Sequence, residues 1–195
     1  DLIILKDSTI GFEILSFAKN GGHVFGICGG LQMLGRRLED PFGLEGASAV
    51  GHSKGIAGLD MIPIYTTFTK DKSLNKLSTK SIWPNSEPLL GFELHHGRSK
   101  VVPGCENFVQ PLTETTSLGW VMNINGTSRI AGTYLHGIFE NGRWRRQWIN
   151  QLRNQKGLKD LAIDEPDHSE RREKLLDLLA DTFQKYVDLT PLLRS

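Results

Sequence analysis

The sequence is poor in cysteine: its 195 residues include two, Cys28 and Cys105, which lie far apart. Small secreted domains that depend on disulfides carry several cysteines at short spacings. The sequence therefore argues against a disulfide scaffold and indicates a reducing, cytoplasmic environment. A single bond between the two cysteines stays open as an alternative at this stage.

Long apolar runs, a large net charge and internal repeats are also missing. No stretch approaches the roughly 20 apolar residues that span a bilayer. The N-terminal DLIIL opens with an acid and lacks a basic region, so it does not resemble a signal peptide. A net charge of +1 creates no field toward nucleic acid or an anionic membrane. We therefore expect no nucleic-acid or membrane partner, and a length that suits one domain.

The beginning of the chain alternates between strand and helix patterns. The apolar run Asp1–Leu5 has the length of a strand, and residues 10–19 show helical spacing that ends at Gly21. HVFGI then predicts a second strand, and LQMLGRRLED predicts a second helix. This alternation predicts a parallel α/β sheet. A chain that opens on a buried type of strand is expected to belong to a longer protein.

Residues 41–132 have a different character, because they are rich in Gly, Pro and Thr and contain short strand-like pieces. They predict antiparallel or mixed strands with long surface loops. Helices are predicted over 142–155 and 169–187. The second of these carries an apolar face, so we expect it to pack on the body of the protein. The strand-like pieces are MIPIYTTF, LLGFELHH, KVVPG, LGWVMN and RIAGTYL.

The segment Gly26–Gly30 has the form G-x-C-x-G and lies between a predicted strand and a predicted helix. This is the cysteine analogue of the nucleophile elbow, in which a strained turn projects the reactive side chain. Glycines are needed two residues away on either side, because side chains there would collide. The helix N-terminus favours the thiolate, and the Gly29 amide is placed to donate to an oxyanion. The alternative is a buried structural cysteine.

His136 is the best candidate for a base. It follows a strand-like run in GTYLHGIF, which places it at the carboxyl edge of a sheet, where open α/β folds carry their sites. A catalytic cysteine and histidine are commonly distant in sequence and adjacent in the fold. The alternative for any single histidine is a solvated or structural side chain. The other histidines are His23, His52, His95, His96 and His168.

Three stretches of the chain resemble the C-terminal glutamine amidotransferase (glutaminase) domains of cobyric acid synthases, a class I-like, triad-type group. The resemblance runs from about Gly21 to Phe139, and the tail LLDLLADTFQKYVDL fits as well. The glutaminase domains of cobyrinic acid a,c-diamide synthases are similar but tend to differ after the histidine, so they are the alternative. The three stretches are GICGGLQMLGRRLEDPFGLEG, GFELHHGRS and GTYLHGIF.

The resemblance implies an α/β fold of the class I glutamine amidotransferase-like (flavodoxin-like) type. Such a fold has a sheet with helices on both faces and additional mixed or antiparallel strands. It implies Cys28 as the nucleophile and His136 as its base. The residues implied in oxyanion or substrate binding are Gly29, Gly30 and Gln32. The resemblance also implies supporting roles for Glu93, His95 and Arg98. The alternative is that these residues form ordinary salt bridges at the end of a strand.

The same resemblance implies glutamine as the substrate and a separate synthetase as the partner. The chain (1–195) would be the glutamine amidotransferase domain at the C-terminal end of a longer enzyme. An N-terminal synthetase domain, absent here, would use ATP and Mg²⁺ to activate corrinoid carboxylates and would receive the ammonia. No cofactor and no metal are expected in this chain itself.

The chain departs from the family pattern at two places. Many triad glutaminases carry a glutamate two residues after the histidine, where this chain has Ile138. Glu140 or Glu93 could replace it, or a Cys–His dyad could act alone. The family also has a Pro-Gly-Ser/Thr-like loop after the first strand, which supplies an oxyanion donor. Here Leu5 is followed directly by Lys6, so either a segment is missing after Leu5 or the oxyanion hole is incomplete.

Two further functions compete with the amidotransferase. Elbow chemistry is shared with cysteine peptidases and other thiol hydrolases, which belong to the same kind of fold. A non-catalytic binding or subunit-assembly domain could also retain the scaffold after turnover has been lost. Release of glutamate from glutamine distinguishes these alternatives, since neither of the competing functions predicts it.

Overall fold

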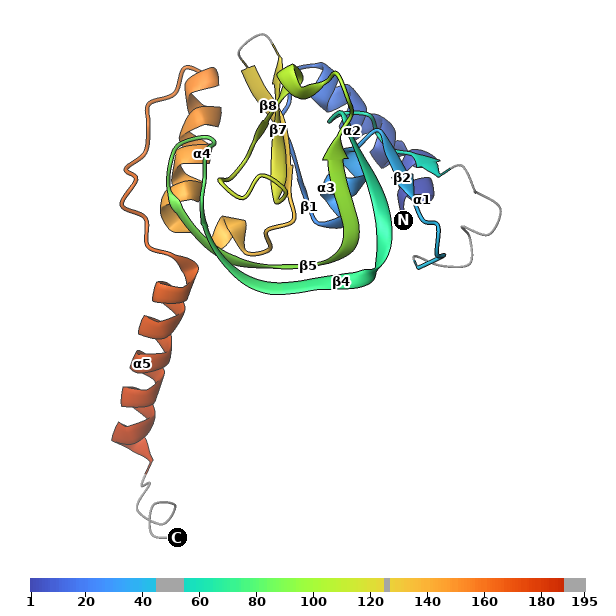
Figure 1. Cartoon of the computed structure of the whole chain (residues 1–195). Helices are drawn as coiled ribbons and strands as arrows, with labels where there is room; N and C mark the ends of the chain where they lie inside the picture. The colour runs from blue at the N-terminus through green and yellow to red at the C-terminus, as the bar shows by residue number, and fades with distance from the viewer. Residues whose placement is uncertain (45–54, 125–126, 188–195) are drawn as a thin grey trace. The chain divides into compact units, whose positions relative to one another are not determined.

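The computed structural model describes residues 1–44, 55–124 and 127–187 (Figure 1). The chain divides into two compact units, Asp1–Ile138 and Phe139–Ser195. The first unit contains both sheets and the proposed nucleophile and base, Cys28 and His136.

Two helices open the first unit, α1 (Leu2–Lys6) and α2 (Thr9–Lys19). The strand predicted over Asp1–Leu5 is therefore wrong. A short apolar run does not by itself distinguish a strand from a helix. A helix satisfies its backbone groups within the segment, whereas a strand needs a neighbour. Ser8 caps α2, because its hydroxyl accepts a hydrogen bond from the Gly11 amide at 3.2 Å.

The predicted end of α2 is confirmed. Gly21 has φ +87°, a left-handed conformation that glycine adopts without a steric penalty. The amides of Gly21 and Gly22 donate to the carbonyls of Ala18 and Phe17 at 3.0 and 2.8 Å. This Schellman-type end turns the chain into β1 (Val24–Ile27).

The helix after Cys28 is shorter than the sequence pattern predicted. It is α3 (Gly29–Leu34), and the following residues form β2 (Arg37–Glu39) instead of further helical turns. Gly35 ends the helix in an extended conformation, with φ −66° and ψ 172°. The Arg36 amide then donates to the Ile64 carbonyl at 2.7 Å, so the next residues run alongside a strand.

Each of the two sheets has four strands and mixes parallel with antiparallel pairs. The first has the order β1-β8-β7-β6, with β1 and β8 parallel, and the second has the order β3-β2-β4-β5, with β2 and β4 parallel. The expected α/β fold with additional antiparallel strands is confirmed. The remaining strands are β3 (Ile56–Ala57), β4 (Ile64–Lys80), β5 (Pro88–Val101), β6 (Val109–Pro111), β7 (Gly119–Ile124) and β8 (Thr127–Thr133). Short 3₁₀ helices are η2 (Glu106–Phe108) and η3 (Ile138–Glu140).

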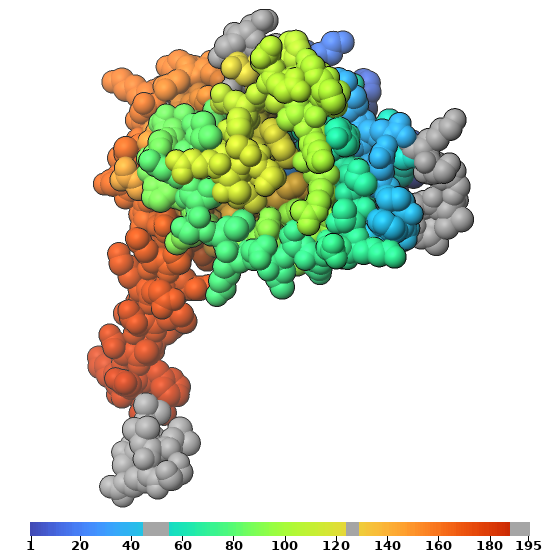
Figure 2. All heavy atoms as spheres, viewed as in Figure 1, coloured from blue at the N-terminus to red at the C-terminus, as the bar shows by residue number. Residues whose placement is uncertain are grey.

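Strands β4 and β5 form one long antiparallel hairpin, not the short strands with long loops that the sequence predicted. The pairing runs from Ile64 opposite Val101 to Lys80 opposite Pro88, with an irregularity after Phe68. The two strands curve together (Figure 1), and their green side chains form a band along one border of the first unit (Figure 2). The length of the strands was missed because the sequence of this region is polar, and both strands contain several exposed residues.

The core of the first unit forms where α3 packs against the loops and strands that follow it. Leu31, Ile62 and Ile64 are fully buried, and Tyr134, which follows β8, is 1% exposed. Because α3 contributes to this core, the turn that carries Cys28 is attached to a packed part of the molecule.

The second unit contains two helices, α4 (Gly142–Gln155) and α5 (His168–Tyr186), close to the predicted boundaries. Trp144 of α4 is fully buried, and the Phe139 ring packs edge-on against it. No side chain of α5 is buried. The packing of its apolar face on the body of the protein stays a prediction. None of the helices in the described residues combines the length and apolar composition needed to cross a membrane.

Candidate active site

Cys28 occupies the predicted strand-to-helix turn. It lies directly after β1 and caps α3, with φ 53° and ψ −112°, a conformation that a non-glycine residue rarely adopts. Its amide donates to the carbonyl of Thr133, the last residue of β8, at 2.8 Å. Such strain persists only where the surrounding structure imposes it, and it is concentrated at functional sites. Cys28 and Cys105 are both free, which excludes the disulfide alternative.

The two glycines that flank the turn have different steric roles. A Cβ on Gly26 would lie 2.6 Å from the carbonyl carbon of Gly30, so a side chain at Gly26 cannot be accommodated without movement of the backbone. A Cβ on Gly30 itself would meet open space. The predicted requirement for glycine is therefore met before the cysteine but not after it.

Gly29 and Gln32 both belong to α3. Gly29 is the first helical residue, so its amide has no acceptor within the helix. The Gln32 amide donates to the Cys28 carbonyl at 3.2 Å. The side chain of Gln32 is buried, and its Nε2 donates to the Tyr134 hydroxyl at 3.3 Å.

His136 lies three residues beyond the end of β8, the parallel neighbour of β1. Its backbone pairs with Phe92 of β5 through two hydrogen bonds of 2.8 and 3.2 Å. The His136 imidazole stacks on the Phe92 ring, with centroids 4.9 Å apart. Its Nε2 is buried without a hydrogen-bond partner. A buried and unpaired imidazole nitrogen is costly in a purely structural residue.

Strand β5 brings the cysteine and the histidine to the same region. The Cys28 thiol donates to the Leu94 carbonyl at 3.5 Å, and His136 pairs with Phe92, two residues earlier on the strand. Two residues of extended chain span about 7 Å. Cys28 and His136 also follow adjacent parallel strands, so both lie at the carboxyl edge of the first sheet.

No carboxylate of the described residues forms an ion pair with His136. Glu93 instead approaches Nε2 of His95 at 3.3 Å and accepts a hydrogen bond from Asn75 at 2.6 Å. Glu140 is exposed and belongs to the second unit. Ile138, at the usual position of the orienting acid, is fully buried.

The three residues with expected supporting roles divide into a pair and a separate residue. Glu93 and His95 contact each other, and the His95 ring stacks on Tyr134 with centroids 3.7 Å apart. Arg98 is exposed, whereas its neighbours Gly97 and Ser99 are buried. Because side chains alternate along a strand, Arg98 lies on the opposite face of β5 from His95.

Cys28, Gly29 and Gln32 line a cavity of about 530 Å³. Leu94 and His95 contribute from β5, and the first residues of the chain, including part of α1, form another section of the wall. A volume of this size is ordinary for a small-molecule site, with room for an amino acid. His136 is not among the lining residues. Leu5 and Lys6, where the resemblance implied a loop with an oxyanion donor, belong to helix α1.

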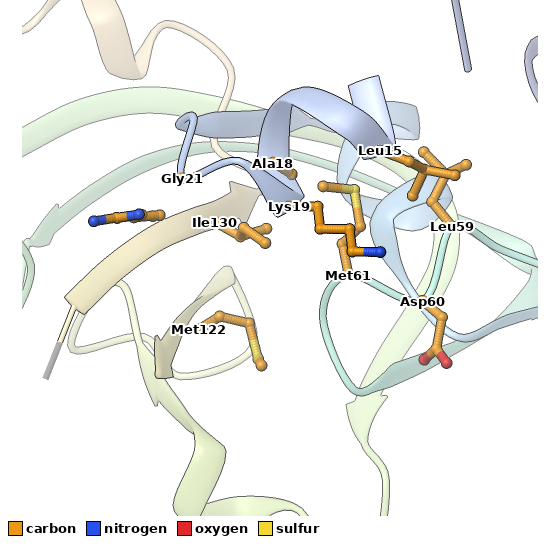
Figure 3. Close-up of a pocket in the computed structure, with 10 residues that line it drawn as sticks. Leu15, Ala18, Lys19, Gly21, Leu59, Asp60, Met61, Met122 and Ile130 are labelled. Atoms are coloured by element: carbon orange, nitrogen blue, oxygen red, sulfur yellow. The ribbon is translucent and has the colours of Figure 1, made fainter. Parts of the chain in front are cut away.

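A second cavity, of about 590 Å³, lies between α2 and the strands β7 and β8 (Figure 3). Its wall combines apolar side chains, such as Met61 and Met122, with the charged residues Lys19 and Asp60. It contains no cysteine, serine or histidine that could act as a nucleophile or base. The larger cavity is therefore not the candidate for catalysis.

Tyr134 is the principal residue of this region that received no role from the sequence. Burial raises the pKa of its phenol above the ordinary value, so the hydroxyl stays neutral. It accepts from Gln32 and lies 2.6 Å from the Ser99 hydroxyl. Two features of the sequence could have identified Tyr134: it lies two residues before His136, and its aromatic side chain carries a polar hydroxyl.

A cysteine lies on a strained turn between a strand and a helix, and a histidine lies three residues beyond the adjacent parallel strand. In this mixed α/β fold, the arrangement is that of a class I-like glutamine amidotransferase. Residues 1–144 match the CobB/CobQ-like glutamine amidotransferase domain, and the chain belongs to this family.

Similar proteins include two cobyric acid synthases. The cobyric acid synthase of Prochlorococcus marinus (strain MIT 9313) is 48% identical over 193 residues, which are 99% of this chain and 38% of that protein. That of Synechococcus sp. (strain WH7803) is 48% identical over 197 residues, which are 99% of this chain and 39% of that protein. The chain therefore spans about two fifths of the length of these relatives.

Proposed function

We propose that this chain hydrolyses the side-chain amide of glutamine, with Cys28 as the nucleophile and His136 as the base. The observation that carries the proposal is the arrangement around β5. A strained cysteine turn contacts Leu94, and a histidine with a buried, unpaired nitrogen pairs with Phe92. Family membership supports the same chemistry.

The reaction is acyl transfer through a thioester. The Cys28 thiolate attacks the amide carbon of glutamine, and the carbonyl electrons move onto the oxygen. The tetrahedral intermediate collapses as the C–N bond breaks, and protonated His136 gives its proton to the leaving nitrogen, so ammonia departs. Water then loses a proton to the same imidazole and attacks the thioester. Glutamate leaves, and the Cys28 thiol is restored.

The Gly29 amide is the proposed donor to the oxyanion, because it lacks a helical acceptor and lines the cavity. Gly30 follows it in the first turn of α3. His136 acts without an orienting carboxylate, as a Cys–His dyad, since the described acids make no ion pair with it.

The ammonia is proposed to serve an ATP-dependent synthetase that amidates corrinoid carboxylates. Support comes from the similar proteins, which are named cobyric acid synthases and are longer than this chain. ATP and Mg²⁺ would act in that synthetase part. This chain would contribute glutamine binding, hydrolysis and release of ammonia next to its partner.

A diazo-ketone analogue of glutamine tests the nucleophile. Cys28 and Cys105 are both partly exposed, so exposure alone does not predict which one reacts. We expect mass spectrometry to find the label on Cys28 and not on Cys105. Cys28→Ser should abolish labelling and glutamate release, and Cys105→Ser should retain both. Equal labelling of the two cysteines would contradict the proposal, and the absence of both Cys28 labelling and glutamate release would favour the binding-domain alternative.

The acceptor is tested with the N-terminal three fifths of the Prochlorococcus relative, supplied with ATP and Mg²⁺. We expect glutamine-dependent amidation of a corrinoid that already carries its a- and c-amides. Ammonium chloride should support the same amidation without this chain, which controls for an active synthetase. Glutamine-dependent amidation at only the a and c positions would instead assign the chain to the diamide synthases.

A further inference from the structure

A chain of buried polar side chains connects α3, β4 and β5 with the segment that follows β8. The Gln32 Nε2 of α3 donates to the Tyr134 hydroxyl at 3.3 Å. That hydroxyl lies 2.6 Å from the Ser99 hydroxyl of β5, which lies 2.7 Å from the Thr66 hydroxyl of β4. All four residues are at most 9% exposed.

The Tyr134 hydroxyl accepts a hydrogen bond from Gln32 Nε2. In the pairs Tyr134–Ser99 and Ser99–Thr66 either hydroxyl could be the donor, because each carries one hydrogen and can also accept. Because burial raises the pKa of Tyr134, the hydrogen stays on the phenol. The bond to Gln32 needs an acceptor oxygen at this position, which a phenylalanine ring does not supply.

The surroundings leave Tyr134 and Gln32 little freedom. The His95 ring stacks on Tyr134 at 3.7 Å, and His95 is itself held by the Gly97 carbonyl and Glu93, at 2.7 and 3.3 Å. A Cβ on Gly97 would lie 2.4 Å from Gln32 Nε2, so the strand passes directly over the amide. In a close-packed network of this kind, the side chains of Gln32 and Tyr134 are held in a single arrangement.

The two partners of the central bond are connected to the two proposed catalytic residues. Gln32 lies one helical turn after Cys28, and its amide donates to the Cys28 carbonyl. Tyr134 lies two residues before His136 in the segment that follows β8. We propose that Tyr134 is a positioning residue, whose hydrogen bond to Gln32 holds the Cys28 turn in register with His136. The proposal rests on the proposed function, since it concerns the alignment of that cysteine and histidine.

Tyr134→Phe removes the hydroxyl and keeps the ring that stacks on His95. We expect kcat for glutamine hydrolysis to fall about 10- to 100-fold, because misplacement of reacting groups by about 1 Å costs roughly that much. KM should change less than about 2-fold, since the ring and the cavity wall remain. The matched control is Ser99→Ala, which removes a hydroxyl from the same network but keeps the bond between Gln32 and Tyr134. Its kcat should stay within about 3-fold of the parent.

The melting temperature of each variant separates positioning from general stability. Loss of kcat in proportion to the fall in melting temperature, equal for Tyr134→Phe and Ser99→Ala, would overturn the proposal. Unchanged kcat in Tyr134→Phe would overturn it as well. If Tyr134→Phe does not fold, Gln32→Met removes the same bond from the other side and carries the same expectation.

The double variant distinguishes positioning from a direct role of Gln32 in substrate binding. If the two residues act through their mutual bond, Gln32→Met with Tyr134→Phe should be no slower than either single variant. If Gln32 binds glutamine, the double variant should show a raised KM and additive losses, which would contradict the proposal.

Alkylation of Cys28 by iodoacetamide gives a readout that does not need turnover. The pH profile of this reaction reports the thiolate, and His136→Ala should shift it if the imidazole is adjacent. We expect Tyr134→Phe to move the profile toward that of His136→Ala, and Ser99→Ala to leave it in place. A chain that never releases glutamate but shows this pattern would refute the proposed function and retain the positioning role. Identical profiles in the parent and Tyr134→Phe would refute the positioning role alone.

Discussion

Helices α3 and α5 both carry leucines at helical spacing, but they differ in burial. Helix α3 has six residues, and Leu31 and Leu34 among them are buried. Helix α5 has 19 residues and none is buried, with Leu175 and Leu179 more than half exposed. An apolar stripe therefore shows that a helix is suited to packing, whereas the neighbouring elements decide whether the stripe is covered.

The difference also bears on where the chemistry lies. The short helix is attached to the strained cysteine turn, to the Tyr134 network and to the core, so each change there should have a large effect. The long helix makes few contacts within the described residues, so changes there should be tolerated. The following predictions test this contrast, starting with the largest effect.

His136→Ala should reduce glutamine hydrolysis by about 10²–10⁴-fold, the usual contribution of a general acid–base group. Glutamate release is the measurement, with the synthetase part of a relative present. His95→Ala is the matched control, because His95 lines the cavity but both of its ring nitrogens have hydrogen-bond partners, Glu93 and the Gly97 carbonyl. We expect a smaller loss from it. A larger loss in His95→Ala would transfer the role of base to His95.

Ile138→Glu complements that experiment by placing an acid at the position used in many triad enzymes. Ile138 is fully buried, so a carboxylate there would lose its hydration without an obvious partner. We expect the variant to be less stable and no more active than the parent. A clear gain in kcat would mean that the site lacks an orienting acid that it can use.

Leu31→Ala should destabilise the protein by about 2–5 kcal/mol, because this fully buried side chain leaves a cavity in the core. Leu179→Gln, an exposed site on α5, should change the free energy of unfolding by less than about 0.5 kcal/mol. Urea unfolding of both variants gives the comparison. A large loss from Leu179→Gln would show that α5 is covered in solution.

Gly26→Ala should cost about 1–3 kcal/mol, since its Cβ would collide with the backbone of Gly30. Gly30→Ala should be close to neutral, because the corresponding space is open. Thermal unfolding, together with the rate at which the diazo-ketone labels Cys28, measures both effects. Equal losses for the two variants would contradict the steric account of the turn.

The smallest effect concerns Tyr134 at alkaline pH. Burial raises the pKa of its phenol above that of the unfolded chain, which is about 10. The native state therefore binds the proton more tightly. The resulting stability is present below pH 10 and is lost as the pH rises through the native value. In unfolding experiments between about pH 9 and 11.5, the stability of Tyr134→Phe should decline less steeply than that of the parent. Parallel curves would exclude this linkage.

Several features could be predicted from the sequence because their causes are local. The glycine spacing around Cys28 predicted the sharp turn, and Gly21 predicted the end of α2. The motifs around Cys28 and His136 identified the family. Each of these depends on a few neighbouring residues, where steric limits and hydrogen bonds act over a short distance.

Other predictions failed where a distant partner decided the outcome. Residues Leu2–Lys6 are helical although the run suits a strand, because strand formation depends on a neighbour that periodicity does not specify. The residues after Gly35 join a sheet through a hydrogen bond to Ile64, and the spacing of the leucines does not predict this pairing. The length of the β4–β5 hairpin depended on pairing across the whole of both strands.

The sequence by itself determined the nucleophile turn, the end of α2 and the family, since these follow from adjacent residues and their sterics. Only the tertiary structure decided that β5 contacts both Cys28 and His136, and that Tyr134 binds Gln32 across 102 positions of sequence. Contacts over such separations carry no periodicity. They form because burying the core brings these polar groups together, where each must find a partner.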